Sequence, residues 1–211
     1  MIDIENVSYK YPHGGAPVFS GFSACFERGE IVAVTGRNGC GKTTMTKLIA
    51  GMLRPAEGRI SIDGADTAKM DLFEIGQKLG YIFQNPNNQL FCDTVFNEVA
   101  YGLRNQGAPE DVVSQKAERF LEMFDLTRYR EKYPGNLSLG EKQRLALAAV
   151  LALGTDYLAL DEPTAGLDVC RRRELGDLLV RLRDDMNCGI IFVSHERGFI
   201  ARYADRELEM P

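Results

Sequence analysis

Apolar and polar positions along this chain separate into two patterns, one typical of strands and one typical of helices. Four short, mostly apolar runs are spread through the sequence, at residues 31–35, 79–83, 157–160 and 189–194. Runs of this length and character are typical of strands buried on both faces of a parallel sheet. Helix-compatible segments separate them, so the pattern predicts an α/β fold with a mainly parallel core sheet.

The first thirty residues follow a different pattern. Residues 2–9 alternate apolar with polar side chains, residues 18–27 partly do so, and Gly14, Gly15 and Gly29 punctuate the chain between and after these segments. Such alternation indicates strands with one buried and one exposed face. We therefore expect an N-terminal antiparallel β-subdomain, residues 1–30, that covers one side of the core.

Residues 85–153 are predicted to be largely helical. At residues 109–124 the apolar side chains recur at the spacing of an amphipathic helix. Further on, Ser138 and Glu141 have the spacing of a capping box at the start of an apolar helix. We interpret this region as a helical subdomain inserted into a core made of residues 31–84 and 154–211. The whole chain, residues 1–211, would then be a single domain.

Composition limits the classes of function. Hydrophobic residues make up 45% of the chain, charged residues 26%, and the net charge is −5. An acidic balance argues against a nucleic-acid partner, because such partners usually require a basic surface. The longest apolar run, residues 145–153, is too short to span a membrane, and the first residues lack a signal-peptide pattern. The five cysteines show no C-x-x-C spacing. We expect a chain that stays in the cytosol, with buried thiols rather than a disulfide framework or a zinc site.

The strand expected at residues 31–35 leads into the sequence GRNGCGKT, which fits the phosphate-binding pattern G-x-x-x-x-G-K-[ST]. Its glycines allow a tight turn that aims backbone N–H groups at phosphate, and the following helix adds its positive end. Lys42 can reach the β- and γ-phosphates, and the Thr43 hydroxyl can ligate Mg²⁺. The sequence therefore predicts nucleoside triphosphate binding. The binding residues expected in this segment are Gly36, Asn38, Gly39, Cys40, Gly41, Lys42, Thr43 and Thr44.

Two carboxylates follow the apolar run at residues 157–160. Asp161 would hold magnesium through water, and Glu162 would orient or deprotonate an attacking water. Two acids at this position can also mark a plain exit from a strand. Here they come after a phosphate loop and before the sequence PTAGLD, so we assign metal and catalytic roles to the pair.

Further motifs lie along the chain on either side of the two carboxylates. They are Gln84 at the end of an expected strand, LSLGE at residues 137–141, AGLD at residues 165–168, and His195 at the end of another strand. Together with the phosphate loop and the two carboxylates, they resemble the ATP-binding cassette (ABC) family over almost the whole chain. The resemblance implies a P-loop ATPase fold with ATP and Mg²⁺ as cofactors.

The resemblance also implies roles for single residues. Tyr11 resembles the aromatic residue that stacks on adenine, with Tyr9 as a rival for that role. Gln84 resembles the glutamine of the family's Q-loop, and His195 resembles its switch histidine. The implied catalytic residues are Glu162, His195 and Gln84, and the implied metal contacts are Thr43, Gln84 and Asp161.

In this family two cassettes meet head to tail, and each ATP lies between the phosphate loop of one and the signature helix of the other. The resemblance implies that the helix starting at Ser138 points at a nucleotide bound by a second ABC subunit, identical or different. Asp168 would reach across the interface. The signature residues implied in nucleotide contact are Ser138, Gly140 and Glu141. ATP would hold the pair together, and hydrolysis would loosen it.

The segment YIFQNPNNQLF at residues 81–91 and the residues that follow it resemble energy-coupling factor ATPases, which drive uptake of vitamins and of cobalt or nickel ions. In that subfamily two cassettes bind an integral-membrane coupling protein, and a small membrane protein captures the substrate. The resemblance places the chain at the cytoplasmic face of the membrane. Four apolar residues would line a groove for a helix of the coupling protein or, alternatively, pack the helical subdomain. They are Leu90, Phe91, Val95 and Phe96.

Three features depart from the family pattern. Leu139 stands where the first of two signature glycines is usual, and its side chain could crowd the phosphate. Cys40 replaces a serine or similar small residue, at a helix N-terminus that is expected to favour the thiolate. The sequence also ends soon after His195, whereas energy-coupling factor cassettes commonly carry a further C-terminal domain. Pairing is therefore expected to depend more on ATP or on the membrane partner.

Other functions are compatible with the same motifs. Another ABC importer or an exporter is one alternative. ATPases of chromosome maintenance use the same cassette but split it with a long coiled coil, and residues 84–137 show no sustained heptad pattern. Cassettes that act on ribosomes usually have two copies and basic linkers in one chain.

Overall fold

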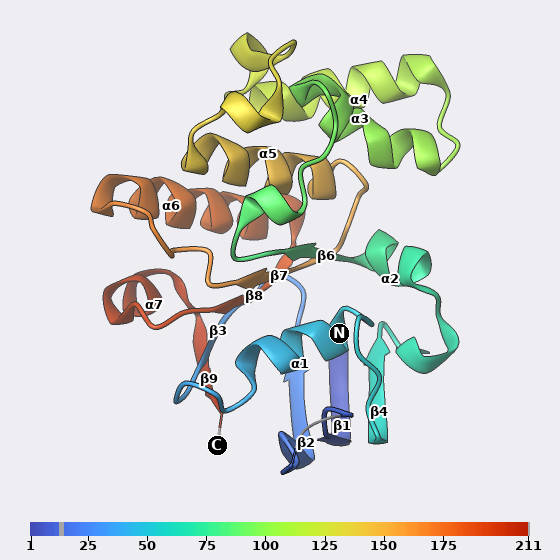
Figure 1. Ribbon diagram of the computed structural model, residues 1–211, viewed down its shortest axis with the longest axis vertical. Coiled ribbons are helices and arrows are strands. Elements are labelled where there is room, and N and C mark those ends of the chain that lie inside the picture. The colour runs from blue at the N-terminus through green and yellow to red at the C-terminus, as the bar shows by residue number, and fades with distance from the viewer. Residues whose placement is uncertain (13–14, 211) are drawn as a thin grey trace.

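The computed structural model describes residues 1–12 and 15–210, which form two sheets with helices packed around them (Figure 1). The larger sheet is parallel throughout and has the strand order β6-β7-β8-β3-β9. Its strands are β6 (Leu79–Ile82), β7 (Tyr157–Asp161), β8 (Gly189–Val193), β3 (Ile31–Thr35) and β9 (Arg206–Glu209). The prediction of an α/β fold with a parallel core sheet is confirmed.

The parallel sheet is buried because helices cover both of its faces. Helices α5 (Leu139–Leu151) and α6 (Val169–Met186) lie on one side, and α1 (Lys42–Ile49) lies on the other (Figure 1). Alternate residues of β3 accordingly face two separate hydrophobic clusters. Ile31 and Ala33 belong to the cluster shared with α5 and α6, and Val32 and Val34 belong to the cluster shared with α1. Helix α7 (Arg197–Tyr203) connects β8 to β9.

The smaller sheet is antiparallel and has the order β2-β1-β4-β5. Its strands are β1 (Ile2–Tyr9), β2 (Phe19–Phe26), β4 (Glu57–Ile62) and β5 (Ala65–Asp66). Strand β4 pairs with β1 from Ile2↔Ile62 to Ser8↔Glu57. The antiparallel part therefore extends beyond residues 1–30. A short helix, α2 (Leu72–Lys78), leads from this sheet back to β6.

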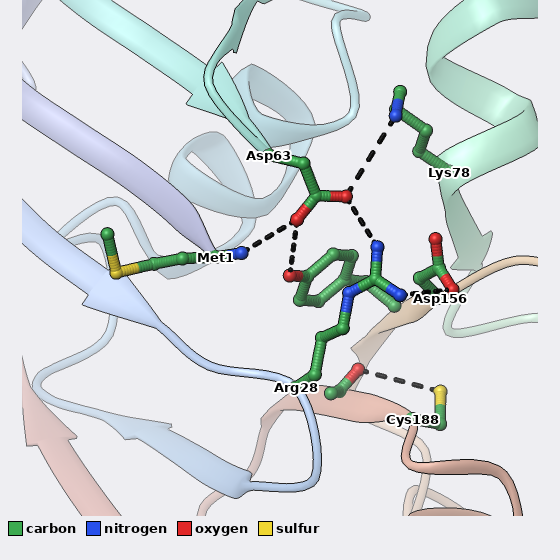
Figure 2. A network of polar contacts seen from close by, with 8 residues as sticks. Met1, Arg28, Asp63, Lys78, Asp156 and Cys188 are labelled. Carbon is green, nitrogen blue, oxygen red and sulfur yellow. Dashed lines mark hydrogen bonds and ion pairs between the residues drawn. The ribbon is translucent and has the colours of Figure 1, made fainter.

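A polar network around Asp63 joins the two sheets (Figure 2). Asp63 follows β4 and accepts hydrogen bonds from the Met1 ammonium at 2.7 Å, from Arg28 at 2.7 Å and from the Tyr157 hydroxyl at 3.0 Å. Arg28 also bonds Asp156 at 2.7 Å, just before β7. Burial alone would raise the pKa of Asp63, but these bonds outweigh it and lower that pKa to about 2.

The region between β6 and β7 is helical. It contains α3 (Val95–Asn105), α4 (Glu110–Met123) and α5, together with the 3₁₀ turns Pro86–Asn88, Thr127–Tyr129 and Pro134–Asn136. Val95 and Phe96 are buried in the core of this region, as one of the two alternatives for them predicted. Leu90 packs partly against the same core, whereas Phe91 is 65% exposed and contacts Tyr101 edge to face at 4.8 Å.

Over residues 1–12 and 15–210, none of the helices combines the length and the apolar character that crossing a bilayer requires.

Candidate functional site

The turn from β3 into α1 depends on glycines at two critical positions. Gly36 has φ 137° and Gly41, the N-terminal cap of α1, has φ 101°, both in the region that favours glycine. A Cβ atom at Gly41 would also lie 2.5 Å from Cγ1 of Val18. The backbone can thus fold into a tight loop directly in front of the helix N-terminus, which is the geometry of an anion cradle.

The Lys42 side chain folds back over this loop. Its Nζ donates hydrogen bonds to the carbonyl oxygens of Gly36 and Arg37, both at 3.0 Å, and the residue is buried. A buried ammonium whose bonds go to neutral carbonyls gains strongly from an added anion, because opposite charges attract more in a poorly solvated site. The loop and Lys42 together form a site for phosphate.

A cleft of about 780 Å³ opens over the loop. Residues from separate parts of the chain line it, including the segment after β1, the phosphate loop and the segments that follow β6, β7 and β8. The predicted site residues in this cleft are Tyr11, Asn38, Gly39, Gly41, Lys42, Thr43, Thr44, Gln84, Glu162 and His195. Cys40 does not line it, because its side chain packs against Gly36 and the hydrophobic cluster below α1.

Thr43, which lines this cleft, contacts Asp161 at the end of β7. The Thr43 hydroxyl donates to Oδ1 of Asp161 at 2.9 Å, and Asp161 is buried. Hydroxyl and carboxylate oxygens are the donors that Mg²⁺ prefers, so the pair fits that ion. No group of three or more His, Cys, Asp and Glu residues within residues 1–12 and 15–210 could hold a metal by itself. A magnesium ion here would therefore take further ligands from water and phosphate.

Glu162 occupies an unusual backbone conformation directly after β7. Its φ is 49°, which is uncommon for a residue with a side chain other than Asn, Asp or His. Its Oε1 lies 3.2 Å from Nε2 of His195, and the side chain is 22% exposed. Burial raises the pKa of Glu162, and the nearby Asp161 raises it further, while His195 acts in the opposite direction. A carboxylate tuned this way is a stronger base than a solvated one.

The two tyrosines that compete for the adenine-stacking role lie in different environments. Tyr11 is 39% exposed and lines the cleft, and its hydroxyl is 3.0 Å from the Thr44 hydroxyl. Tyr9 is 7% exposed and does not line the cleft. It packs edge to face against Tyr11, with the two ring centroids 5.0 Å apart. Of the two tyrosines, only Tyr11 lines the cleft.

The predicted signature residues lie away from the phosphate loop. Ser138 and Glu141 form the expected capping box, in which the Ser138 amide donates to Glu141 at 2.7 Å and the Glu141 amide donates to Ser138 at 3.4 Å. A hydrogen bond from Tyr129 is the largest influence on Glu141 and helps to lower its pKa to about 2. These residues and Gly140 line a second cleft of about 590 Å³.

Asp168 lines the same second cleft, where it caps α6 by accepting from the Arg171 amide at 2.9 Å. Leu139 is 38% exposed. A Cβ atom built on Gly166 would lie 3.4 Å from Cδ2 of Leu139, so this side chain lies against the segment that carries Asp168. Within one chain the structure does not bring this group to the phosphate loop. A nucleotide shared by both groups requires a second chain.

Several residues that stabilise the site were not predicted from the sequence. Gln89 supports the end of β6, accepting from the Phe83 amide and donating to the Tyr81 carbonyl, both at 3.3 Å. Gln143, buried on α5, donates to the Pro163 carbonyl at 2.5 Å. The only sequence signal for Gln143 is an amide beside the apolar stretch of a helix, which identifies no partner.

Comparison with known proteins places the chain among transport ATPases. The family model described as ABC transporter matches residues 19–165. The energy-coupling factor transporter ATP-binding protein EcfA1 of Fusobacterium nucleatum is 41% identical over 95% of this chain and 75% of its own length. The chain spans only about a third of the first curated relatives it matches, such as a putative ABC transporter ATP-binding protein of Methanosarcina acetivorans, 40% identical over 98% of this chain and 33% of its own length.

The fold is shared with solved structures. The structure of cbiO1 from Clostridium perfringens, part of the ABC transporter complex cbiONQ, superposes with a TM-score of 0.90 at 32% identity, over 99% of this chain and 84% of its own. The family model covers most of this chain, and relatives above 30% identity match it over nearly its whole length. The chain therefore belongs to the ABC transporter family.

Proposed function

We propose that this chain is the ATP-binding and ATP-hydrolysing subunit of an ABC transporter of the energy-coupling factor type, driving uptake of a vitamin or a transition-metal ion. The observation that carries the proposal is the cleft lined by Lys42, Thr43 and the Glu162–His195 pair, with Asp161 bonded to Thr43. A phosphate cradle, a metal-ligand pair and a base thus face one space. The names of the EcfA1 and cbiO1 relatives support the transporter type.

Nucleotide binding would use the residues of the cleft as they stand. The Tyr11 ring would stack on adenine, and the loop amides would surround the phosphates. Lys42 would exchange its bonds to the Gly36 and Arg37 carbonyls for bonds to the β- and γ-phosphates. Thr43, Asp161 and the Gln84 side chain would hold Mg²⁺, which supplies positive charge to the phosphate oxygens when bound.

Hydrolysis would depend on the two residues at the ends of β7 and β8. Glu162 would accept the proton of a water as the oxygen of that water bonds to the γ-phosphorus and the bond to the ADP oxygen breaks. His195, 3.2 Å from Glu162, would hold that carboxylate in place and contact the γ-phosphate. Gln84, at the mouth of the same cleft, would orient the water.

A second cassette, identical or different, would complete the site. Ser138, Gly140 and Glu141 lie in a cleft away from the phosphate loop of their own chain, so they would contact a nucleotide held by the partner. Asp168 would lie at the interface. A solved dimeric cassette bound to ADP and Pi superposes with a TM-score of 0.86 at 27% identity, over 100% of this chain and 94% of its own. That dimer supports a pair of cassettes.

The membrane partners would be an integral-membrane coupling protein and a small substrate-capture protein, with this chain bound peripherally at the cytoplasmic face. The exposed Phe91–Tyr101 pair, next to the Q-loop segment, offers an apolar contact for a helix of the coupling protein. No nucleic-acid partner is proposed. Salt-sensitive binding to DNA or ribosomes would instead favour the alternatives outside transport.

Phosphate release tests the enzymatic part of the proposal. The purified chain should hydrolyse ATP only with Mg²⁺, and Lys42→Ala and Glu162→Gln should each abolish turnover. Glu110→Gln, which removes a similar charge from an exposed site on α4, should retain the wild-type rate. Failure of the wild type to bind ATP or release phosphate would contradict the proposal.

Sedimentation with membranes of the source cells tests the transport part. The chain should sediment with membranes that contain its partners. Phe91→Ser together with Tyr101→Ser should reduce that association without changing ATP binding. Met186→Ser, which alters an exposed apolar residue at the far end of α6, is the control. Equal association of the double variant and the wild type would contradict this docking site.

A further inference from the structure

Gln143 is a polar residue on the buried, mostly apolar face of α5. It is 9% exposed, and its neighbours along the helix include the fully buried Leu145, Ala146 and Leu147. Its Nε2 donates to the carbonyl oxygen of Pro163 at 2.5 Å. Burial of an amide is unfavourable unless its hydrogen bonds are made, so this bond determines where the side chain and the carbonyl lie.

Pro163 belongs to the turn that carries Glu162. The turn closes through a bond from the Ala165 amide to the Glu162 carbonyl at 3.1 Å, and Glu162 holds its φ of 49° there. On the far side of Pro163, the Thr164 hydroxyl is 3.1 Å from the Ser194 hydroxyl, next to His195. Gln143 and Ser194 therefore hold the turn from two different elements, α5 and the end of β8.

Helix α5 connects Gln143 to the signature motif. Ser138 caps the N-terminus of the same helix, and Gln143 lies in its second turn. A helix moves as a rigid unit over so short a length, because each residue is bonded to the one four positions before it. Any shift of the signature end is thus passed to the Pro163 carbonyl and to the Glu162 turn.

We propose that Gln143 is a positioning residue for ATP hydrolysis that ties the signature helix to the turn bearing Glu162. The proposal rests on the hydrolytic function proposed above. In a head-to-tail pair, α5 contacts the nucleotide of the partner while Glu162 acts on the nucleotide of its own chain. Gln143 connects those two contacts through one side-chain bond to the residue after Glu162.

The test compares Gln143→Met with the wild type in steady-state ATP hydrolysis. Methionine keeps the length of the side chain and suits a helix, but it cannot donate to the Pro163 carbonyl. We expect kcat to fall about tenfold or more while KM for ATP stays within about twofold, because small displacements of a catalytic group cost rate rather than binding. Gln143→Glu, which keeps shape and polarity without the donor, should lose rate to at least the same degree.

Gln106→Met is the matched control. Gln106 also donates its Nε2 to a backbone carbonyl, that of Leu153 at 3.5 Å, but it joins α3 to the C-terminal end of α5, away from Glu162. This variant should keep the wild-type kcat. The melting temperature of each variant separates loss of rate from loss of fold.

The outcomes are distinguishable from failure of the proposed function. If the wild type hydrolyses no ATP, the proposed function fails before any variant is compared. If the wild type is active and Gln143→Met and Gln143→Glu keep its kcat, the bond only stabilises the fold and the positioning role is wrong. A rise in KM at constant kcat would likewise overturn the proposal, since it would place Gln143 in nucleotide binding instead.

Discussion

The Thr43 hydroxyl donates a hydrogen bond of 2.9 Å to Oδ1 of Asp161, although 118 positions separate the two residues. The bond joins the first turn of α1 to the end of β7. Two oxygens this close can give up the hydrogen bond between them and coordinate one cation together. The pair thus links the phosphate loop to the strand that carries the carboxylates.

Loss of the Thr43 hydroxyl should weaken the magnesium site. In Thr43→Val the shape of the side chain is kept, but one oxygen ligand is lost. We expect the Mg²⁺ concentration for half-maximal ATP hydrolysis to rise about tenfold. A magnesium titration at fixed ATP measures it. Thr127→Val, at an exposed position, is the control, and an unchanged titration of Thr43→Val would exclude Thr43 as a ligand.

The ring of Tyr11, rather than its hydroxyl, should set the affinity for adenine. Tyr11→Phe loses the contact with Thr44 but keeps the stacking face, so its Kd for ATP should stay close to that of the wild type. Tyr11→Ala should raise that Kd about tenfold. Equilibrium titration measures both, with Tyr133→Ala as an exposed control. Equal affinities of Tyr11→Ala and the wild type would assign the adenine contact to another residue.

The fall in the rate of ATP hydrolysis at low pH should follow the protonation of Glu162. Burial raises its pKa above the ordinary 4.5, and Glu162 can accept a proton only when ionised. Activity should therefore fall, as the pH decreases, at a pH above 4.5. The pH profile of kcat measures it, with enzyme returned to neutral pH as the control for unfolding. A rate that stays constant to below pH 4.5 would exclude Glu162 as the base.

Asp63 should make folding stability depend on pH in the acid range. Its pKa is about 2 in the folded chain, below the ordinary 3.8, so the carboxylate stabilises the fold fully above pH 4 and loses that contribution as the pH falls towards 2. Asp63→Asn should lower the free energy of unfolding at pH 7 by about 1–2 kcal/mol. It should also have a smaller loss of stability between pH 4 and 2.

Denaturant unfolding at several pH values tests this prediction. Asp185→Asn, an exposed substitution on α6, is the control for the loss of one charge. If Asp63→Asn and the wild type lose stability in parallel between pH 4 and 2, the network around Asp63 does not join the two sheets energetically.

Several elements of the fold could be predicted from the sequence because their signals are local. Buried apolar runs gave β3, β7 and β8, and the capping box gave the start of α5. Strand β4 was not predicted. Its sequence, EGRISI, is short and begins with polar residues, and its place is fixed by pairing with β1 some fifty residues away. Pairing between distant strands leaves no periodicity that a single segment could reveal.

The site shows the same limit. Motif spacing indicated Lys42, Thr43 and Asp161, and the structure places Lys42 and Thr43 in one cleft with Asp161 bonded to Thr43. The roles of Gln89 and Gln143 depend on which backbone carbonyl each side chain reaches, and that follows only from tertiary packing. The alternatives for Val95 and Phe96 were likewise decided by burial against α4 and α5, not by their own sequence.

The central claim is that two cassettes share each ATP, with Ser138 of one chain facing Lys42 of the other. Light scattering of Glu162→Gln with and without Mg²⁺ and ATP tests it most directly, because blocked hydrolysis should trap the pair. We predict a shift from the mass of one chain to that of two when both are added, with Leu139 accommodated at the interface. A mass that stays at one chain while ATP is bound would contradict a shared site built from two copies of this chain.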